Sequence, residues 1–200
     1  MLEALNRSLF LSLNASDHPS AVLLALALGM GQWLIYAIPA LLLGLWLWDA
    51  RGSRGTVLVA ALALLVALCG NQLIDLVAFH PRPFMIPLGH TFLDHAAETS
   101  FPSDHATVFF ALGVAFCCQH RRRLGMLLVG TGVLVGASRI YLGVHFPFDI
   151  VGALLVSVAS VWGLLAVLGK APVHVGLLER LERLYRRLFA LPIQRGWVHG

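Results

Sequence analysis

The chain has 200 residues, of which 58% are hydrophobic and only 12% are charged, and its formal net charge is +4. A soluble globular domain carries roughly twice that charged fraction, so the composition excludes such a domain and predicts an integral membrane protein. The small net charge does not indicate a nucleic-acid partner. The three cysteines form no CxxC pair, which argues against a disulfide framework and a zinc site.

The first residues are expected to form a short helix that lies on the membrane surface. Leu2, Leu5, Leu9 and Leu13 recur at helical spacing, and a helix with one apolar face lies in the interfacial region of a bilayer. No basic segment precedes this apolar stretch, as a signal peptide would require. The prediction covers residues 2–14.

Five apolar segments follow, and they predict an all-α bundle with about five transmembrane helices. A bilayer core requires about 20 apolar residues per helix, and the segments that reach or approach this length are Ala21–Trp48, Thr56–Phe79, His105–Gln119, Leu124–Leu142 and Ile150–Leu168. The third is the shortest, and we expect its N-terminal end to be buried in protein. Residues 80–104 are too polar and too rich in proline to span.

The C-terminal residues 175–189 predict a second amphipathic helix, with leucines on one face and arginines on the other. Such a helix binds the anionic cytoplasmic leaflet; docking onto a partner protein is the alternative. The chain is thus expected to be one domain. Its parts would be an interfacial helix (1–20), a transmembrane core (21–169) and a basic tail (170–200).

The basic residues predict the orientation of the bundle. Of the 14 lysines and arginines, all but Arg7, Arg82 and Arg139 fall on one side of the predicted spans. The majority side is cytoplasmic by the positive-inside rule, and its members are Arg51, Arg54, Arg121, Arg122, Arg123, Lys170, Arg180, Arg183, Arg186, Arg187 and Arg195. The C-terminus would therefore be cytoplasmic, and the loops between spans two and three and between spans four and five would face outward.

These two outward loops carry polar residues that are costly at the ends of apolar segments and are therefore expected to be functional. His145 and Asp149 lie four positions apart at the start of the fifth span. A carboxylate bonded to one imidazole nitrogen fixes the tautomer and leaves the other nitrogen free as a nucleophile. The alternative role for Asp149 is to cap the helix, although capping alone does not explain His145.

Further residues at the same ends of the spans suit a phosphate. His105 begins the third span and could protonate a leaving group, while Ser103 and the first N–H groups of that helix could hold phosphate oxygens. Arg82 and Arg139 present planar charged forks of the kind that bind phosphate, although Arg139 could instead reach the membrane interface. Ser138 is either a small packing residue or a further phosphate contact.

A metal site is the competing interpretation, because several histidines and carboxylates occur in these loops. No tight ligand spacing such as HExxH is present, and the two arginines would repel a cation, so no metal is expected. His90, His95 and Glu98 are expected to shape the outer loop or to contact a head group.

The quoted residues resemble the type 2 phosphatidic acid phosphatase (PAP2) superfamily, which includes the vanadium haloperoxidases. The matching strings are Arg82-Pro83, Pro102-Ser103-x-His105 and Ser138-Arg139-x5-His145-x3-Asp149. The resemblance implies a metal-free phosphatase without a cofactor, in which His145 is the nucleophile, His105 the general acid and base, and Asp149 the residue that orients His145. Arg82, Ser103, Arg139 and Ser138 would then bind phosphate.

Two positions depart from the general pattern of that superfamily. A lysine is expected where this chain has Asp75, and a glycine where it has Asp104. Asp75 could instead pair with Arg82 or Arg139 and set its position. Asp75, Asp104, His80 and Pro83 are therefore treated as residues that shape the site.

The strings Phe79-His80-Pro81-Arg82-Pro83-Phe84-Met85, Gly89-His90-Thr91 and Ser100-Phe101-Pro102-Ser103-Asp104-His105 resemble a narrower branch, the bacterial undecaprenyl-diphosphate phosphatases of the BcrC type. Asp104 is expected in that branch. The resemblance implies hydrolysis of undecaprenyl diphosphate at the outer face of the bacterial inner membrane, recycling of the carrier lipid for the cell wall, and bacitracin resistance.

The sequence is compatible with three alternative functions. The chain could hydrolyse another lipid, such as phosphatidylglycerol phosphate or phosphatidic acid, because the motif recognises phosphate and not the lipid tail. It could transfer the phosphoryl group to an acceptor other than water. A small transporter is the non-enzymatic alternative, although its polar residues would be expected near the membrane midplane. The sequence does not specify an oligomeric state.

Overall fold

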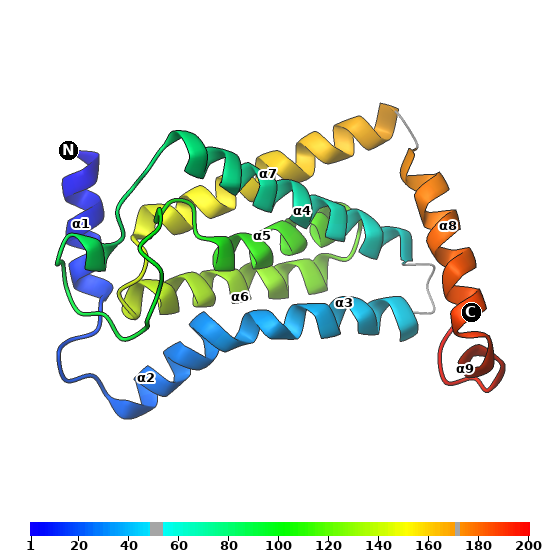
Figure 1. Ribbon diagram of the computed structural model, residues 1–200, viewed down its shortest axis with the longest axis horizontal. Coiled ribbons are helices and arrows are strands. Elements are labelled where there is room, and N and C mark those ends of the chain that lie inside the picture. Colours follow the sequence, from blue (N-terminus) through cyan, green and yellow to red (C-terminus); the bar gives the residue numbers. More distant parts are fainter. Residues whose placement is uncertain (49–53, 171–172) are drawn as a thin grey trace.

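The computed structural model describes residues 1–48, 54–170 and 173–200, and within them every regular element is helical. The helices form an elongated bundle in which the longest elements run roughly along one axis (Figure 1). Helix α1 crosses one end of this bundle and helix α8 crosses the other. The prediction of an all-α helical bundle is confirmed.

Helix α1 (Leu2–Leu13) has nearly the predicted extent, but it packs on protein with one face. Its leucines remain exposed, whereas Asn6 and Phe10 are buried. Asn6 Oδ1 accepts a hydrogen bond from the backbone N–H of Phe148 at 3.0 Å, and the ring of Phe10 lies 5.3 Å from that of Phe146. The helix is therefore attached to the start of α7 as well as being suited to the membrane surface.

The first predicted span is one continuous helical segment, Ala21–Trp48, with an irregular centre. Its parts are α2 (Ala21–Leu28), a π-helical turn η1 (Gly29–Trp33), a 3-10 turn η2 (Leu34–Tyr36) and α3 (Ala37–Trp48). The irregularity lies one turn before Pro39, which has no N–H to donate and whose ring collides with the carbonyl four residues earlier. That carbonyl belongs to Ile35, inside the 3-10 turn.

Three more helices are long and apolar enough to cross a membrane, and α5 is shorter. The long ones are α4 (Arg54–Val77), α6 (Arg122–Tyr141) and α7 (Pro147–Lys170), and the short one is α5 (Asp104–Cys118). At 1.5 Å per residue α5 is about 22 Å long, less than the roughly 30 Å of a bilayer core. Most of its residues from Ala106 to Phe116 are buried among its neighbours, as the sequence predicted.

Helices α5 and α6 approach closely because small residues face each other. A Cβ added to Gly113 would lie 2.8 Å from the backbone nitrogen of Val129, and one added to Gly125 would lie 2.6 Å from the carbonyl oxygen of Gly113. Small residues permit such backbone contact between membrane helices. These contacts lie near the connection between the two helices, and further along the pair a Cβ added to Gly132 would lie 2.7 Å from the ring of Phe110.

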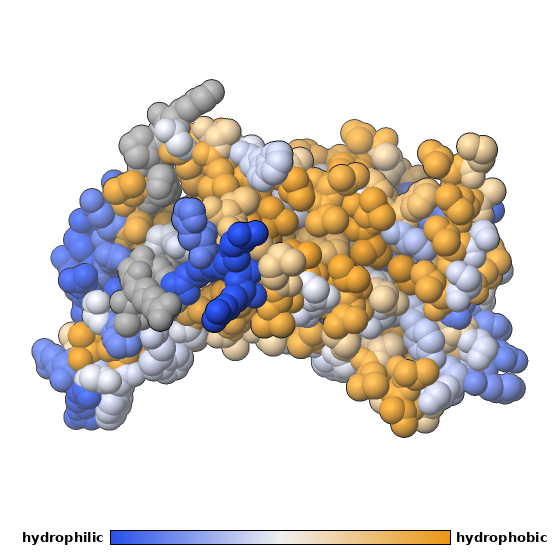
Figure 2. Space-filling model, turned by 180° about the vertical axis from the view of Figure 1, so that it is seen from behind, coloured by the Kyte–Doolittle hydropathy of each residue, from blue (hydrophilic) through white to orange (hydrophobic). Residues whose placement is uncertain are grey.

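The outer surface divides into a broad apolar region between polar ends (Figure 2). Helices α8 (Val173–Leu188) and α9 (Ala190–Gln194) lie at the end opposite to α1. Tyr185 of α8 is buried there beneath the guanidinium of Arg54, whose central carbon lies 4.3 Å from the ring centroid. Arg51 of the predicted basic side lies outside the described residues, and so does the side chain of Lys170.

Candidate active site

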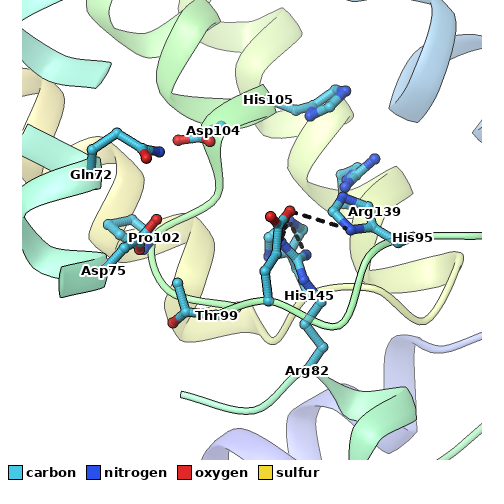
Figure 3. A pocket seen from close by; sticks show the side chains of 11 residues that line it. Gln72, Asp75, Arg82, His95, Thr99, Pro102, Asp104, His105, Arg139 and His145 are labelled. Atoms are coloured by element: carbon cyan, nitrogen blue, oxygen red, sulfur yellow. Dashed lines mark hydrogen bonds and ion pairs between the residues drawn. The ribbon is translucent and has the colours of Figure 1, made fainter. Parts of the chain in front are cut away.

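A cavity of about 180 Å³ opens at the end of the bundle that α1 crosses, and segments distant in sequence line it (Figure 3). Helix α4, the long loop after it, the first residues of α5, the end of α6 and the loop before α7 all contribute. The lining residues are Gln72, Asp75, Arg82, His95, Glu98, Thr99, Pro102, Asp104, His105, Arg139 and His145.

The two loops that carry the motifs are joined by backbone contacts. The N–H of Phe92 donates to the carbonyl of Leu142 at 3.0 Å, and the N–H of Ser103 donates to the carbonyl of Asp149 at 3.3 Å. Gly143 adopts a φ of +82°, and a side chain there would collide with the carbonyl of His90. The chain therefore reverses after α6 at a residue with no side chain, and this turn places His145 beneath the long loop.

The protonation pattern of His145 follows from its two sets of neighbours. Its Nδ1 lies 2.9 Å from the carbonyl oxygen of Ser100 and 3.3 Å from Oδ2 of Asp149. Its Nε2 lies 3.1 Å from Nη1 of Arg82. A guanidinium can only donate and a carbonyl can only accept, so the proton is on Nδ1 and Nε2 carries the lone pair. Nε2 is thus the nitrogen suited to act as a nucleophile.

Burial also favours the neutral imidazole. His145 is 2% exposed. Burial lowers its pKa well below the usual value, and the positive charges of Arg139 and Arg82 lower it further. A neutral side chain at physiological pH is the form that can attack an electrophile.

The carboxylate of Asp149 reaches both His145 and the start of α7. It occupies the third position of the helix after Pro147, and its Oδ2 accepts the backbone N–H of Phe146 at 2.7 Å. A carboxylate at this position that reaches back to the N-cap residue is half of a capping box. One carboxylate oxygen therefore contacts both His145 and the first turn of α7, although Asp149 is not itself the N-cap residue. That Asp149 orients His145 for catalysis stays a prediction.

Ser100 is a site residue that sequence analysis did not identify. Its hydroxyl donates to Oδ2 of Asp149, and its carbonyl accepts from Nδ1 of His145. The side chain is fully buried. In the sequence, Ser100 is noted only as the first residue of the string that ends at His105, and membership of that string does not indicate a role for its side chain.

Two buried arginines give the cavity a strongly positive wall. Arg82 is 5% exposed and donates to the carbonyl of Val144 at 3.0 Å, while Arg139 is 1% exposed and donates to the carbonyl of Gly31 at 3.2 Å. Nε of Arg82 and both Nε and Nη2 of Arg139 are buried without a hydrogen-bond partner. Buried charged donors are costly unless paired, so the arrangement fits an anion with several acceptor oxygens.

Glu98 is the one carboxylate that forms an ion pair with either arginine among the described residues, and it is weakly held. Its Oε1 lies 3.4 Å from Nη2 of Arg82, and its side chain is 60% exposed. Burial lowers the pKa of Arg82, whereas Glu98 and Asp149 act in the opposite direction. An entering phosphate would compete with Glu98 for Arg82.

The start of α5 contributes polar groups at another edge of the cavity. Ser103 is the N-cap residue, is fully buried, and its hydroxyl has no hydrogen-bond partner. His105 lines the cavity directly, and Asp104 accepts a 2.7 Å hydrogen bond from the amide of Asn71. Asp104 and His105 therefore line the same cavity as His145, whereas Ser103 is buried directly before them and does not line it.

Gln72 and Asp75 of α4 lie on the side of the cavity opposite to Arg139 (Figure 3). The described residues show no hydrogen bond or ion pair between Asp75 and either arginine, and Oδ1 of Asp75 is buried without a partner. The expectation that Asp75 pairs with Arg82 or Arg139 is therefore wrong, because Glu98 from the long loop reaches Arg82 instead. His95 also lines the cavity, and burial and the charge of Arg82 lower its pKa.

Besides Ser103 and Asp149, three predicted residues lie outside the cavity lining. Ser138 donates to the carbonyl of Leu134 one turn earlier at 2.8 Å and lines an apolar groove beside α2 instead, which corrects its assignment as a phosphate contact. Pro83 is buried and begins the 3-10 turn η3 (Pro83–Met85) directly after Arg82. His80 lies behind Asp149, with its Nδ1 3.9 Å from Oδ1 of that carboxylate.

Among the described residues, no group of three or more histidine, cysteine, aspartate or glutamate side chains has the arrangement of a metal site. The cationic groups that face the cavity are the two arginines.

Comparisons with known proteins agree with this geometry. Residues 56–172 match the family model described as the PAP2 superfamily. The chain is 42% identical over 200 residues to Escherichia coli (strain K12) YbjG, named provisionally as an undecaprenyl-diphosphatase, with 99% of each chain covered. It is 38% identical over 154 residues to the Bacillus subtilis (strain 168) undecaprenyl-diphosphatase BcrC, covering 77% of this chain and 79% of that one.

Among solved structures, Aquifex aeolicus LpxE has a similar fold. The TM-score is 0.67 at 23% identity, and the match covers 81% of this chain and 95% of the other. At this level of identity the likeness concerns the fold alone.

Proposed function

The chain belongs to the PAP2 superfamily and is a multi-pass membrane lipid phosphatase, and from this premise we propose that it hydrolyses undecaprenyl diphosphate to undecaprenyl phosphate and phosphate. The observation that carries the proposal is the buried His145, with its proton on Nδ1 and the lone pair of Nε2 facing Arg82, in a cavity lined by two arginines that have unused donors. The choice of lipid is supported by the names of the two relatives.

In the first step, Nε2 of His145 attacks the terminal phosphorus. The new N–P bond forms as the bond from phosphorus to the bridging oxygen breaks, and the electron pair of that bond leaves with undecaprenyl phosphate. His105 donates a proton to the departing oxygen. Asp149 and the carbonyl of Ser100 stabilise the positive charge that develops on the imidazole ring.

In the second step, water attacks the phosphohistidine. His105, now neutral, accepts a proton from the water, and the N–P bond breaks to release phosphate and restore His145. Arg82, Arg139 and Ser103 would hold the equatorial oxygens in both steps, where the charge of a transferred phosphoryl group is spread. The arginines supply the positive charge, so activity is expected to persist in a chelator.

The proposed place of the reaction is the periplasmic or outer face of the bacterial inner membrane. The motif loops lie at the α1 end of the bundle, and the described basic residues of the 121–123 and tail segments lie at the other end. The positive-inside rule then makes α8 and the C-terminus cytoplasmic. We propose that residues 1–200 form one domain, and that recycling the carrier lipid gives resistance to bacitracin.

The test is phosphate release by purified protein in detergent with EDTA. Undecaprenyl diphosphate, phosphatidylglycerol phosphate and phosphatidic acid are compared for wild type, His145→Ala and the control His18→Ala, whose side chain is 94% exposed and lies outside the cavity. We expect preference for the diphosphate, loss of activity in His145→Ala and no loss in the control. Preference for another lipid would refute the substrate, and chelator-sensitive release would refute the mechanism.

A further inference from the structure

The two oxygens of the Asp149 carboxylate have unequal surroundings. Oδ2 receives the hydroxyl of Ser100 and the N–H of Phe146, and it contacts Nδ1 of His145. Oδ1 is buried and has no hydrogen-bond partner. A buried carboxylate oxygen without a donor costs free energy, so a group that faces Oδ1 can influence how this carboxylate is held.

The group that faces Oδ1 is the imidazole of His80. Its Nδ1 lies 3.9 Å from Oδ1 of Asp149, and it too is buried without a hydrogen-bond partner. Two complementary polar atoms that both lack partners therefore face each other. A movement of about 1 Å would bring them to normal hydrogen-bond distance.

His80 is held in this position from three sides. Its Nε2 lies 3.5 Å from Oε2 of Glu3 on α1, and Nε of Arg7 donates to the other oxygen of Glu3 at 2.7 Å. The edge of its ring packs against Phe146, with 5.4 Å between the centroids. Its carbonyl accepts the N–H of Ser100 at 2.7 Å, which joins it to the segment that also holds His145.

We propose that His80 is a positioning residue: as an imidazolium it directs Nε2–H to Glu3 and donates Nδ1–H to Oδ1 of Asp149, and so keeps Asp149 and His145 aligned for attack. This inference rests on the proposed function, because it concerns the same nucleophile. The line of contacts runs from Glu3 through His80 and Asp149 to His145. Helix α1 then belongs to the catalytic unit as well as to the membrane surface.

A set of matched variants tests this role. His80→Phe keeps a ring beside Phe146 and removes the donor, His80→Gln keeps a donor, and His18→Phe is the control because the side chain of His18 is 94% exposed and lies outside the cavity lining. In metal sites, loss of a residue that orients a metal-binding histidine or carboxylate typically costs about 10–100-fold, and we apply the same magnitude to the orientation of Asp149. We expect His80→Phe to lower kcat by roughly that factor with KM within about twofold, and His80→Gln to retain more activity.

The same substitution is then made in the Asp149→Asn background. If His80 acts through Asp149, its effect is expected to shrink there, because residues that work as a unit are not additive. Wild-type kcat in His80→Phe would overturn the proposal. An undiminished loss in the Asp149→Asn background would also overturn it, since His80 would then act independently of Asp149.

A measurement without substrate separates this proposal from the proposed function. Nitrogen-15 NMR of histidine-labelled protein reports which ring nitrogen of His145 carries the proton. We expect the Nδ1-protonated form in wild type and a shifted or broadened His145 signal in His80→Phe. An unchanged signal would overturn the positioning role, whereas a wild-type enzyme inactive on undecaprenyl diphosphate would refute only the substrate.

Discussion

Replacing Ser100 by alanine tests the arrangement around Asp149, because the side chain of Ser100 is fully buried and does not line the cavity. Its hydroxyl donates to Oδ2 of Asp149, and its backbone carbonyl, which alanine retains, accepts from His145. The substitution therefore removes one charge-assisted hydrogen bond and leaves the tautomer of His145 supported.

The size of the effect follows from the kind of bond removed. A hydrogen bond to a charged group contributes about 1.5–3 kcal/mol, and each 1.4 kcal/mol corresponds to about tenfold in rate. If the bond holds Asp149 while the imidazole becomes positively charged, kcat should fall roughly 10–100-fold. KM should stay near the wild-type value, because Ser100 does not line the cavity.

The assay is steady-state phosphate release in detergent, with Ser138→Ala as the matched control. Ser138 lies in the same motif region, but its hydroxyl is bonded to the carbonyl of Leu134 and lines a separate groove, so the control should keep wild-type kinetics. A Ser100→Ala enzyme with kcat within threefold of wild type would refute the reasoning. A much higher KM in the Ser138→Ala enzyme would show that Ser138 contributes to substrate binding, contrary to its position in the structure.

Three further substitutions or conditions have defined outcomes. Arg139→Lys should raise KM and lower kcat, together costing at least about 100-fold in kcat/KM, because an ammonium cannot reproduce the two unpartnered donors of the guanidinium; kinetics within tenfold of wild type would contradict this. Asp75→Asn should strengthen inhibition by inorganic phosphate roughly fivefold, since it removes a negative charge from the cavity wall, and weaker inhibition would show that Asp75 assists binding. Burial lowers the pKa of His145 in the folded chain. Near pH 6.5 the imidazole of His145 therefore binds a proton in the unfolded chain but stays neutral in the folded chain. The His145 contribution to stability is therefore present above that pH and is lost as the pH falls toward the folded pKa. The melting temperature should drop more steeply below pH 6.5 in wild type than in His145→Gln, and equal slopes would show that His145 is not buried in its neutral form.

The membrane spans could be predicted because hydropathy and helix length determine them almost alone. The segment Ala21–Trp48 agrees to the residue, and the burial of the short α5 followed from its length. The number of spans predicted that the two motif loops lie on the same side of the membrane. The irregular turn before Pro39 was not predicted, although the chemistry of proline explains it.

The partners of the site residues could not be predicted, because they come from segments that only the tertiary fold brings together. Ser100 and Glu98 lie in a long loop without periodicity, so nothing in the sequence determines which side chains turn inward. Ser138 is instructive for a different reason. Successive residues on a helix point about 100° apart, so once Arg139 faces the cavity its neighbour in sequence faces elsewhere. The family motif predicted both residues as phosphate contacts, but helix geometry directs only Arg139 into the cavity.

The central claim is that Nε2 of His145 becomes covalently phosphorylated. The direct measurement is rapid acid-free quenching of a single turnover with undecaprenyl diphosphate labelled in its terminal phosphate, followed by peptide mapping. The account predicts label on His145 as an acid-labile, base-stable phosphoramidate, and more of it in His105→Ala, where the base for hydrolysis is missing. Release of labelled phosphate at the wild-type rate with no label on His145 at any time would contradict the account.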